Sequence, residues 1–175
     1  MQSRSSLEIK YADWLREHRG ILLKIAASFG REREEQADLF QEMSIALWRS
    51  LPAFKAQSKT STWIYRVCLN TALAWRRAET KPRGHHAPLE LIPELSSDAP
   101  PPGNAHERDE ILQRLYAAVR ALPPSERSLV ILLLDGLSYR EMGEISGLTE
   151  NHVGVALTRA RKKLAEAMKE VGNEL

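Results

Sequence analysis

Apolar residues recur at spacings of three and four through the first part of the chain, which is the spacing of one face of an α-helix. The pattern predicts a helix over residues 7–29, ended by Gly30, and a second over about 34–50, ended before Pro52. A third helix is expected through residue 78, with Ser61 or Thr62 as its N-cap. The inward side chains expected on the second and third helices are Phe40, Met43, Leu47, Ile64, Val67, Cys68, Thr71, Ala72 and Trp75.

The periodic pattern resumes after residue 107. It predicts a helix over 108–122, which Pro123 and Pro124 break, and another over 125–135, which Gly136 ends. The inward side chains expected on the first of these two helices are Ile111, Leu112, Leu115, Ala118 and Val119. Helical periodicity in both halves of the chain predicts an all-α fold.

Two further helical patterns meet at Gly147. Ser138 can cap the first and Glu141 can complete a capping box, while Gly147 can end that helix in a left-handed turn before Thr149 caps the second. One face of the second helix should be buried through Val153, Ala156, Leu157, Ala160, Leu164 and Met168. The arrangement predicts a helix-turn-helix, whose second helix enters the DNA major groove. An ordinary helical hairpin with a solvated basic end is the alternative.

The stretch from residue 80 to 106 differs from the rest in composition. It holds six of the nine prolines and shows no periodic pattern. Such a composition is typical of an extended linker. We therefore expect an N-terminal domain over residues 1–79 and a C-terminal domain over residues 107–175, which would contain four helices.

The composition excludes several classes of protein. The chain has 175 residues, 43% of them hydrophobic and 27% charged, and no apolar run long enough to span a bilayer. Its first ten residues lack an apolar signal segment, so the expected location is the cytoplasm. A single cysteine excludes a disulfide framework, and the five histidines lack metal-ligand spacing. With no phosphate-binding loop or nucleophile elbow either, neither a metal, a cofactor nor enzymatic activity is expected.

The net charge is only +2, but the charges are segregated along the chain. Five acids stand against one base over residues 32–48, whereas eight bases stand against one acid over residues 49–83. Such segregation predicts one surface suited to a basic protein and a second suited to phosphates, although charged runs can also merely solvate helices. The outer face of the second helix should present Asp38, Gln41, Glu42, Ile45 and Arg49, and that of the third Arg66, Asn70, Leu73 and Arg77.

Two blocks of the sequence resemble a known family. DLFQEMSIALWRSLPAF followed by TSTWIYRVCLNTALAWRR is similar to region 2 of the extracytoplasmic-function (ECF) bacterial sigma factors. ALPPSERSLVILLLDGLSYREMGEISGLTENHVGVALTRARKKL is similar to their region 4. The resemblance implies a sigma factor that binds core RNA polymerase, through the beta-prime clamp and the beta flap, and directs it to promoter DNA. It also implies an anti-sigma factor as a further partner.

The resemblance also implies roles for individual residues. Docking on the polymerase falls to Asp38, Gln41, Glu42 and Arg49. Gripping the melted minus-ten strand falls to the loop over residues 54–62 and to the third helix, with Lys59, Thr62, Trp63, Tyr65, Arg66, Asn70 and Arg77. Reading the minus-thirty-five duplex falls to Asn151, His152, Val155, Thr158, Arg159 and Lys162.

One departure from the family pattern lies in the predicted recognition helix. Members of the family commonly carry basic residues near its middle, where this chain has Gly154 and Ala156. The difference predicts fewer phosphate and guanine contacts. Two alternatives to a sigma factor are a helix-turn-helix regulator that acts without polymerase and a helical adaptor that binds only protein. The regulator leaves the acidic face of the second helix unexplained.

Overall fold

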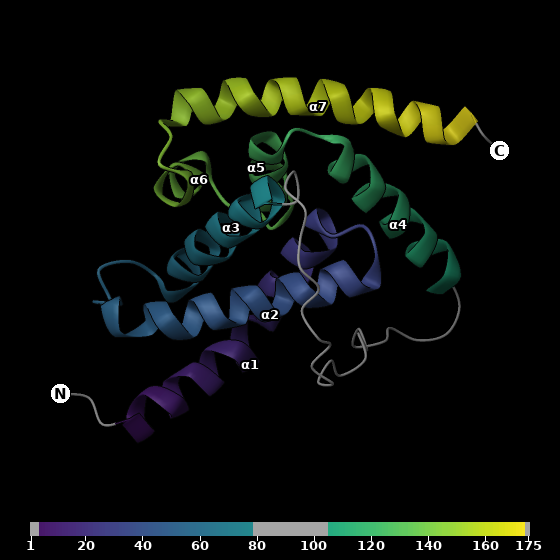
Figure 1. Ribbon diagram of the computed structural model, residues 1–175. Helices are drawn as coiled ribbons and strands as arrows, with labels where there is room; N and C mark the ends of the chain where they lie inside the picture. Colours follow the sequence, from purple (N-terminus) through teal and green to yellow (C-terminus); the bar gives the residue numbers. More distant parts are fainter. Residues whose placement is uncertain (1–3, 79–104, 174–175) are drawn as a thin grey trace.

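The computed structural model describes residues 4–78 and 105–173, with side chains placed for 6–78 and 109–169. All its regular elements are helical, as the sequence predicts (Figure 1). The helices are α1 (Arg4–Phe29), α2 (Arg33–Ser50), a short 3₁₀ helix (Leu51–Ala53), α3 (Thr60–Ala78), α4 (Ala105–Ala121), α5 (Pro124–Leu134), α6 (Tyr139–Ser146) and α7 (Glu150–Asn173). The linker predicted over residues 80–106 lies almost wholly outside the described residues.

Helices α1 to α3 pack together as the N-terminal unit, and their apolar stripes meet in its centre. The fully buried side chains there are Leu22, Ile25, Phe29, Leu39, Met43, Leu47, Ile64, Cys68 and Ala72. Gly30 ends α1, since its backbone N–H donates to the carbonyl of Ala26 over 2.8 Å. The turn after it lets α2 fold back along α1, and the 3₁₀ helix at Pro52 then redirects the chain into α3.

Helices α4 to α7 form the C-terminal unit. The predicted capping box is present at the start of α6: Ser138 Oγ accepts from the backbone N–H of Glu141, whose carboxylate accepts from Ser138 N. Gly147 ends α6 with φ of 76°, and Thr149 Oγ1 accepts from the N–H of His152 at the start of α7. Helix α7 lies across α4, α5 and α6 (Figure 1).

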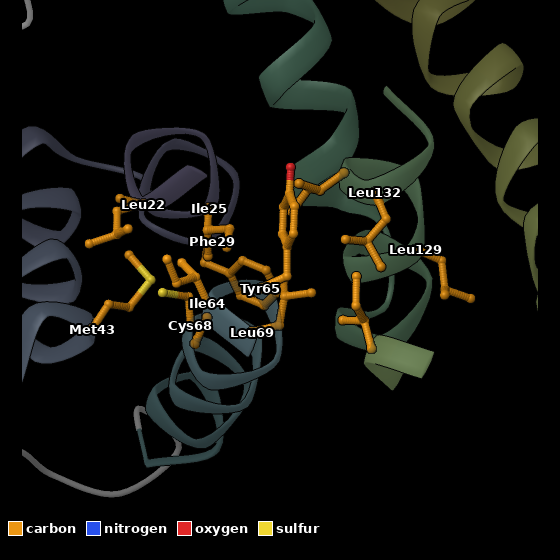
Figure 2. Packing of buried hydrophobic residues seen from close by; sticks show 14 of the residues in the cluster. Leu22, Ile25, Phe29, Met43, Ile64, Tyr65, Cys68, Leu69, Leu129 and Leu132 are labelled. Atoms are coloured by element: carbon orange, nitrogen blue, oxygen red, sulfur yellow. The ribbon is translucent and has the colours of Figure 1, made fainter. Parts of the chain in front are cut away.

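The two units pack against each other. Helix α3 contacts both α5 and α6, and the C-terminal part of the molecule also contacts α1. Figure 2 shows Tyr65 and Leu69 of α3 between the apolar residues of the N-terminal unit and Leu129 and Leu132 of α5. The buried residues therefore form one continuous cluster that spans both units.

Some predictions about single residues were wrong. Ile111 and Leu112 were expected to be inward, but they are 58% and 47% exposed, because only the C-terminal part of α4 reaches the core at Ala118 and Val119. Met168 is also exposed, since it lies toward the free end of α7.

Another wrong prediction concerns the start of the third helix. Helix α3 begins at Thr60, so Ser61 and Thr62 lie in its first turn and neither is its cap. The hydrogen bond from Trp63 N to the carbonyl of Lys59, over 3.2 Å, starts the helix two or three residues earlier than the hydroxyl side chains suggest. On α2, Met43 and Leu47 are fully buried as predicted, whereas Phe40 is only half-buried and Leu39, which the prediction left out, is fully buried beside them.

Candidate nucleic-acid interface

The outer face of α7 carries all six residues predicted for duplex DNA, and all six are exposed: Asn151, His152, Val155, Thr158, Arg159 and Lys162. On the opposite face, Val153, Leu157 and Ala160 are buried against the rest of the unit. One face of α7 thus fixes the helix on the rest of the unit, and the other face is accessible to solvent. The second helix of a helix-turn-helix is exposed in the same way, so that it can enter a DNA groove.

The turn between α6 and α7 depends on two glycines. Gly147 takes the left-handed conformation that the sequence predicts. Gly143 is a position that the sequence analysis missed: a Cβ there would lie 2.6 Å from the carbonyl oxygen of Leu148. The backbone of the turn thus passes directly over Gly143, and only a residue without a side chain leaves room for it. No periodicity or capping signal points to such a close approach.

Gly154, in the second turn of α7, lies beside an aromatic ring. A Cβ at this position would meet the ring of Tyr139 at 3.4 Å, which is an ordinary contact distance. The Tyr139 ring from the first turn of α6 therefore approaches α7 closely at the place where the family pattern has a larger residue.

The outer face of α2 presents Asp38, Gln41, Glu42 and Arg49, all exposed as predicted. Two apolar side chains share the exposed part of this helix: Ile45, which the sequence places on the same face, and Trp48, which it does not. Trp48 is 36% exposed and lies edge-on to Tyr11 of α1, with the ring centroids 5.2 Å apart. The exposed surface of α2 therefore combines carboxylates with an anchored aromatic ring, which is a combination suited to a protein partner.

The basic face of α3 presents Arg66, Asn70 and Arg77, all exposed, and Lys59 is exposed in the loop before it. Thr62, by contrast, is only 6% exposed, so in this arrangement it does not share that surface. Trp63 is half-buried: its indole N–H donates to Ser50 Oγ over 3.2 Å, and its ring lies edge-on to Phe54, 5.5 Å between centroids. Trp63 is thus held by its neighbours rather than free to rotate.

The family models described as Sigma-70 region 2 and Sigma-70 region 4 match residues 14–81 and 112–164. The ECF RNA polymerase sigma factor SigF of Caulobacter vibrioides is 34% identical over 135 residues, which cover 75% of this chain and 70% of that protein. This chain belongs to the ECF RNA polymerase sigma factors. It directs promoter-specific initiation of transcription by RNA polymerase and is not itself an enzyme.

Further relatives agree with this assignment. The RNA polymerase sigma-H factor of Pseudomonas aeruginosa is 26% identical over 158 residues, which cover 84% of this sigma factor and 80% of that one. Among solved structures, CnrH in complex with the cytosolic domain of CnrY shares the fold, with a TM-score of 0.65 at 20% identity and coverage of 93% and 90% of the two chains. The sigma factor RpoE of Bartonella quintana, in complex with the anti-sigma factor NepR, gives a TM-score of 0.61 at 20% identity, covering 90% and 97%.

In this sigma factor, region 4 contacts the basic face of region 2. Lys59 Nζ donates to a carboxylate oxygen of Glu141 over 2.9 Å, and Arg66 donates to the backbone carbonyl of Glu144. The Lys59 ammonium and the capping bonds of Ser138 lower the pKa of Glu141 to about 2, so its carboxylate stays charged at neutral pH.

A second group of contacts lies deeper between the regions. The hydroxyl of Tyr65 donates to Asp135 over 2.5 Å, and Lys24 forms an ion pair with the same carboxylate. Burial, followed by the neighbouring Asp135 carboxylate, raises the pKa of Tyr65. Arg120 of α4 donates to the carbonyl of Ala27 in α1 over 2.9 Å. We call these contacts together, from Lys24, Ala27, Lys59, Tyr65 and Arg66 to Arg120, Asp135, Glu141 and Glu144, the inter-region interface.

Within the described part of the chain, no cluster of histidine, cysteine or carboxylate side chains could hold a metal ion. Cys68 is fully buried in the core of region 2, and burial raises the pKa of its thiol. Among the described helices, none is both long and apolar enough to cross a membrane.

Proposed function

We propose that this sigma factor uses three separate surfaces: the outer face of α2 docks on core RNA polymerase, the basic face of α3 with its preceding loop holds the melted minus-ten strand, and the outer face of α7 reads the minus-thirty-five duplex. The observation that carries the proposal is the exposure of all six α7 residues on one face, opposite a buried one. The clamp of the beta-prime subunit is the proposed partner of α2, and the beta flap that of region 4.

Helix α7 has the side chains that duplex recognition requires. Arg159 and Lys162 supply cations for phosphates or guanine, and Asn151 supplies an amide that can pair with adenine. Val155, 45% exposed, is an apolar side chain of the kind that contacts a thymine methyl group. The small residues at 154 and 156 leave the second turn of α7 without a long cation, so the ionic contacts come from Arg159 and the residues after it.

We expect loss of Arg159 and Lys162 to weaken closed-complex formation on duplex promoters. DNA binding releases about one fewer counterion for each phosphate contact that is lost. Each substitution to Ala should therefore reduce the slope of log binding constant against log salt concentration by about one unit. The measurement is holoenzyme binding to duplex promoter across a salt series. Lys163→Ala is the matched control, because the Lys163 ammonium donates to a carboxylate oxygen of Glu126 over 2.9 Å and is not assigned to DNA. An equal loss of affinity in this control would contradict the assignment.

Asn70 is proposed to act only after the DNA has melted. It is exposed on α3 beside Arg66, and its amide can donate to and accept from an unstacked base. Asn70→Ala should therefore leave duplex binding by the holoenzyme unchanged and reduce open-complex formation, measured as permanganate reactivity of promoter thymines. A template with a pre-melted bubble should rescue the variant if Asn70 drives opening, and should rescue little if it reads base identity. Normal opening on several minus-ten sequences would remove Asn70 from the site.

We also propose that an anti-sigma factor binds this chain. The support is the shared fold with RpoE of Bartonella quintana, which was solved in complex with the anti-sigma factor NepR. The exposed Ile111 and Leu112 on α4 provide an apolar surface that such a partner could cover. Co-purification of the sigma factor with an anti-sigma protein, lost on replacing both residues by Ser, would support this partner and this surface.

A further inference from the structure

The loop before α3, over residues 54–59, leaves and re-enters the helical part of region 2 at one group of side chains. Phe54 follows the 3₁₀ helix, and its backbone N–H donates to the carbonyl of Leu51 over 3.2 Å. Trp63 lies in the first turn of α3, just beyond the loop. The two rings meet edge-on with their centroids 5.5 Å apart. The two ends of the loop are therefore joined through this aromatic pair.

Helix α1 supplies the other half of this group. The buried ring of Trp14 lies edge-on to Phe54, with the centroids 5.0 Å apart. Lys10, one turn earlier on α1, places its ammonium 4.9 Å from the centroid of the Phe54 ring and 5.6 Å from that of Trp14. A cation in this position is attracted by the electrons of the ring. We call Lys10, Trp14, Phe54 and Trp63 together the loop-base cluster.

The end of α2 fixes the orientation of the Trp63 ring. The indole N–H of Trp63 donates to Ser50 Oγ over 3.2 Å, and the same hydroxyl donates to the carbonyl of Leu47 over 3.0 Å. Rotation of the ring would break this link to the last turn of α2. The loop-base cluster therefore connects α1, α2 and α3 at the place where the loop begins and ends.

The backbone of the loop is strained close to this cluster. Ala56, two residues beyond Phe54, has φ of 55°. An L residue is strained in this left-handed conformation and keeps it only where the surrounding structure imposes it, which is common at ligand-binding sites. The fixed ends of the loop therefore impose its shape. A loop that already has its bound shape binds a ligand more tightly, because no further ordering is needed.

We propose that Lys10 and Phe54 are positioning residues for minus-ten recognition: the loop-base cluster holds the loop in the shape that accepts the unstacked bases, and α1 thereby takes part in reading the promoter. The inference rests on the proposed role of the loop in holding the melted strand. The apparent affinity for the preferred base is proportional to the fraction of molecules in which the loop is held. Phosphate contacts outside the loop do not depend on its shape. Weakening the cluster should therefore lower base discrimination and leave the ionic part of DNA binding unchanged.

Phe54→Leu tests the ring, because Leu keeps an apolar side chain but removes both edge-on contacts. The measurement is binding of the holoenzyme to a pre-melted promoter template, compared with the same template changed at one minus-ten base. The ratio of the two affinities should fall about tenfold, the combined effect of two aromatic pairs. Phe54→Tyr keeps the ring and should restore the ratio. A wild-type ratio in Phe54→Leu would overturn the proposal.

Lys10→Met is the second variant, and it keeps the core of region 2 untouched. The affinity ratio should fall about threefold, as expected from the loss of one cation–π contact, and Lys10→Arg should restore it. Across a salt series the slope of log binding constant against log salt concentration should stay at the wild-type value. A slope reduced by about one unit with an unchanged ratio would mean that Lys10 contacts a phosphate, and it would overturn the proposal. The control is Arg16→Met, which removes a cation of α1 that pairs with Asp13 over 2.7 Å and should change neither quantity.

A third variant separates this inference from the proposed function on which it rests. Replacing residues 55–58 by glycines removes the side chains of the loop and leaves the loop-base cluster in place. A wild-type affinity ratio in this holoenzyme would remove the loop from the minus-ten site, whatever the other variants show. A lowered ratio here, together with wild-type ratios in Phe54→Leu and Lys10→Met, would keep the site and overturn the positioning role.

Discussion

Reversing the charges of Asp38 and Glu42 to Lys will abolish assembly with core RNA polymerase and leave the fold of the sigma factor intact. Both carboxylates are exposed on α2, opposite the fully buried Leu39 and Met43, so neither takes part in the core. Surface substitutions of this kind shift the free energy of unfolding by no more than about 0.5 kcal/mol. At a protein interface, by contrast, two residues at its centre can contribute about 2–4 kcal/mol, or about 30- to 1000-fold in affinity.

The measurement pairs a thermal melt of the free chain with titration of a labelled sigma factor against core polymerase. Charge reversal at Glu17 and Glu166, two exposed acids on other helices, controls for the change in net charge. A double variant at positions 38 and 42 that assembles at wild-type affinity would show that the polymerase docks elsewhere on the sigma factor. A lowered melting temperature would instead show that the face has a structural role.

Among substitutions of the region 4 glycines by Ala, Gly143→Ala is expected to lower the stability of the fold the most. Its Cβ would lie 2.6 Å from a backbone oxygen of Leu148, and the backbone of a tight turn cannot move aside as a flexible side chain can. Overpacking of this kind costs about 1–3 kcal/mol. Because the turn sets the position of α7, duplex binding should be lost together with stability.

Gly20→Ala provides the matched comparison, since Gly20 lies within α1 and a Cβ there would meet nothing within 4 Å. The same change should stabilise this helix by about 1 kcal/mol, because Ala is the better helix former. Thermal melts of both variants, with minus-thirty-five duplex binding by the assembled holoenzyme, give the comparison. If the two variants melt alike, the turn must relax around the added methyl and the assignment of Gly143 fails.

Local signals in the sequence were sufficient for most of the helices and their ends. The capping box of Ser138 and Glu141 and the left-handed Gly147 both lie where the sequence predicts them, because caps depend on side chains only a few residues apart. The outward faces of α2 and α7 were likewise predictable, because the spacing of apolar residues by three and four shows which side chains face the core and which face solvent.

Contacts between distant parts of the chain could not be predicted in this way. Tyr65 and Leu69 are buried because region 4 covers them, and helical periodicity within α3 gives no sign of a second buried face. The reverse error affects Ile111 and Leu112, which fit an apolar stripe but lie beyond the reach of the core. Gly143 depends on the path of a turn five residues later, which composition does not encode.

The ion pair between Lys24 and Asp135 joins residues 111 positions apart, and this separation has a consequence for synthesis on the ribosome. At about 5–20 residues per second, translation needs about 5–20 s to pass from the first partner to the second. Region 2 is complete for much of that interval, since α3 ends at Ala78. In a nascent chain, Tyr65, Leu69 and the basic face of α3 therefore lack their contacts with region 4 until α5 and α6 emerge. Each molecule thus passes through a state in which region 2 can fold before region 4 packs against it.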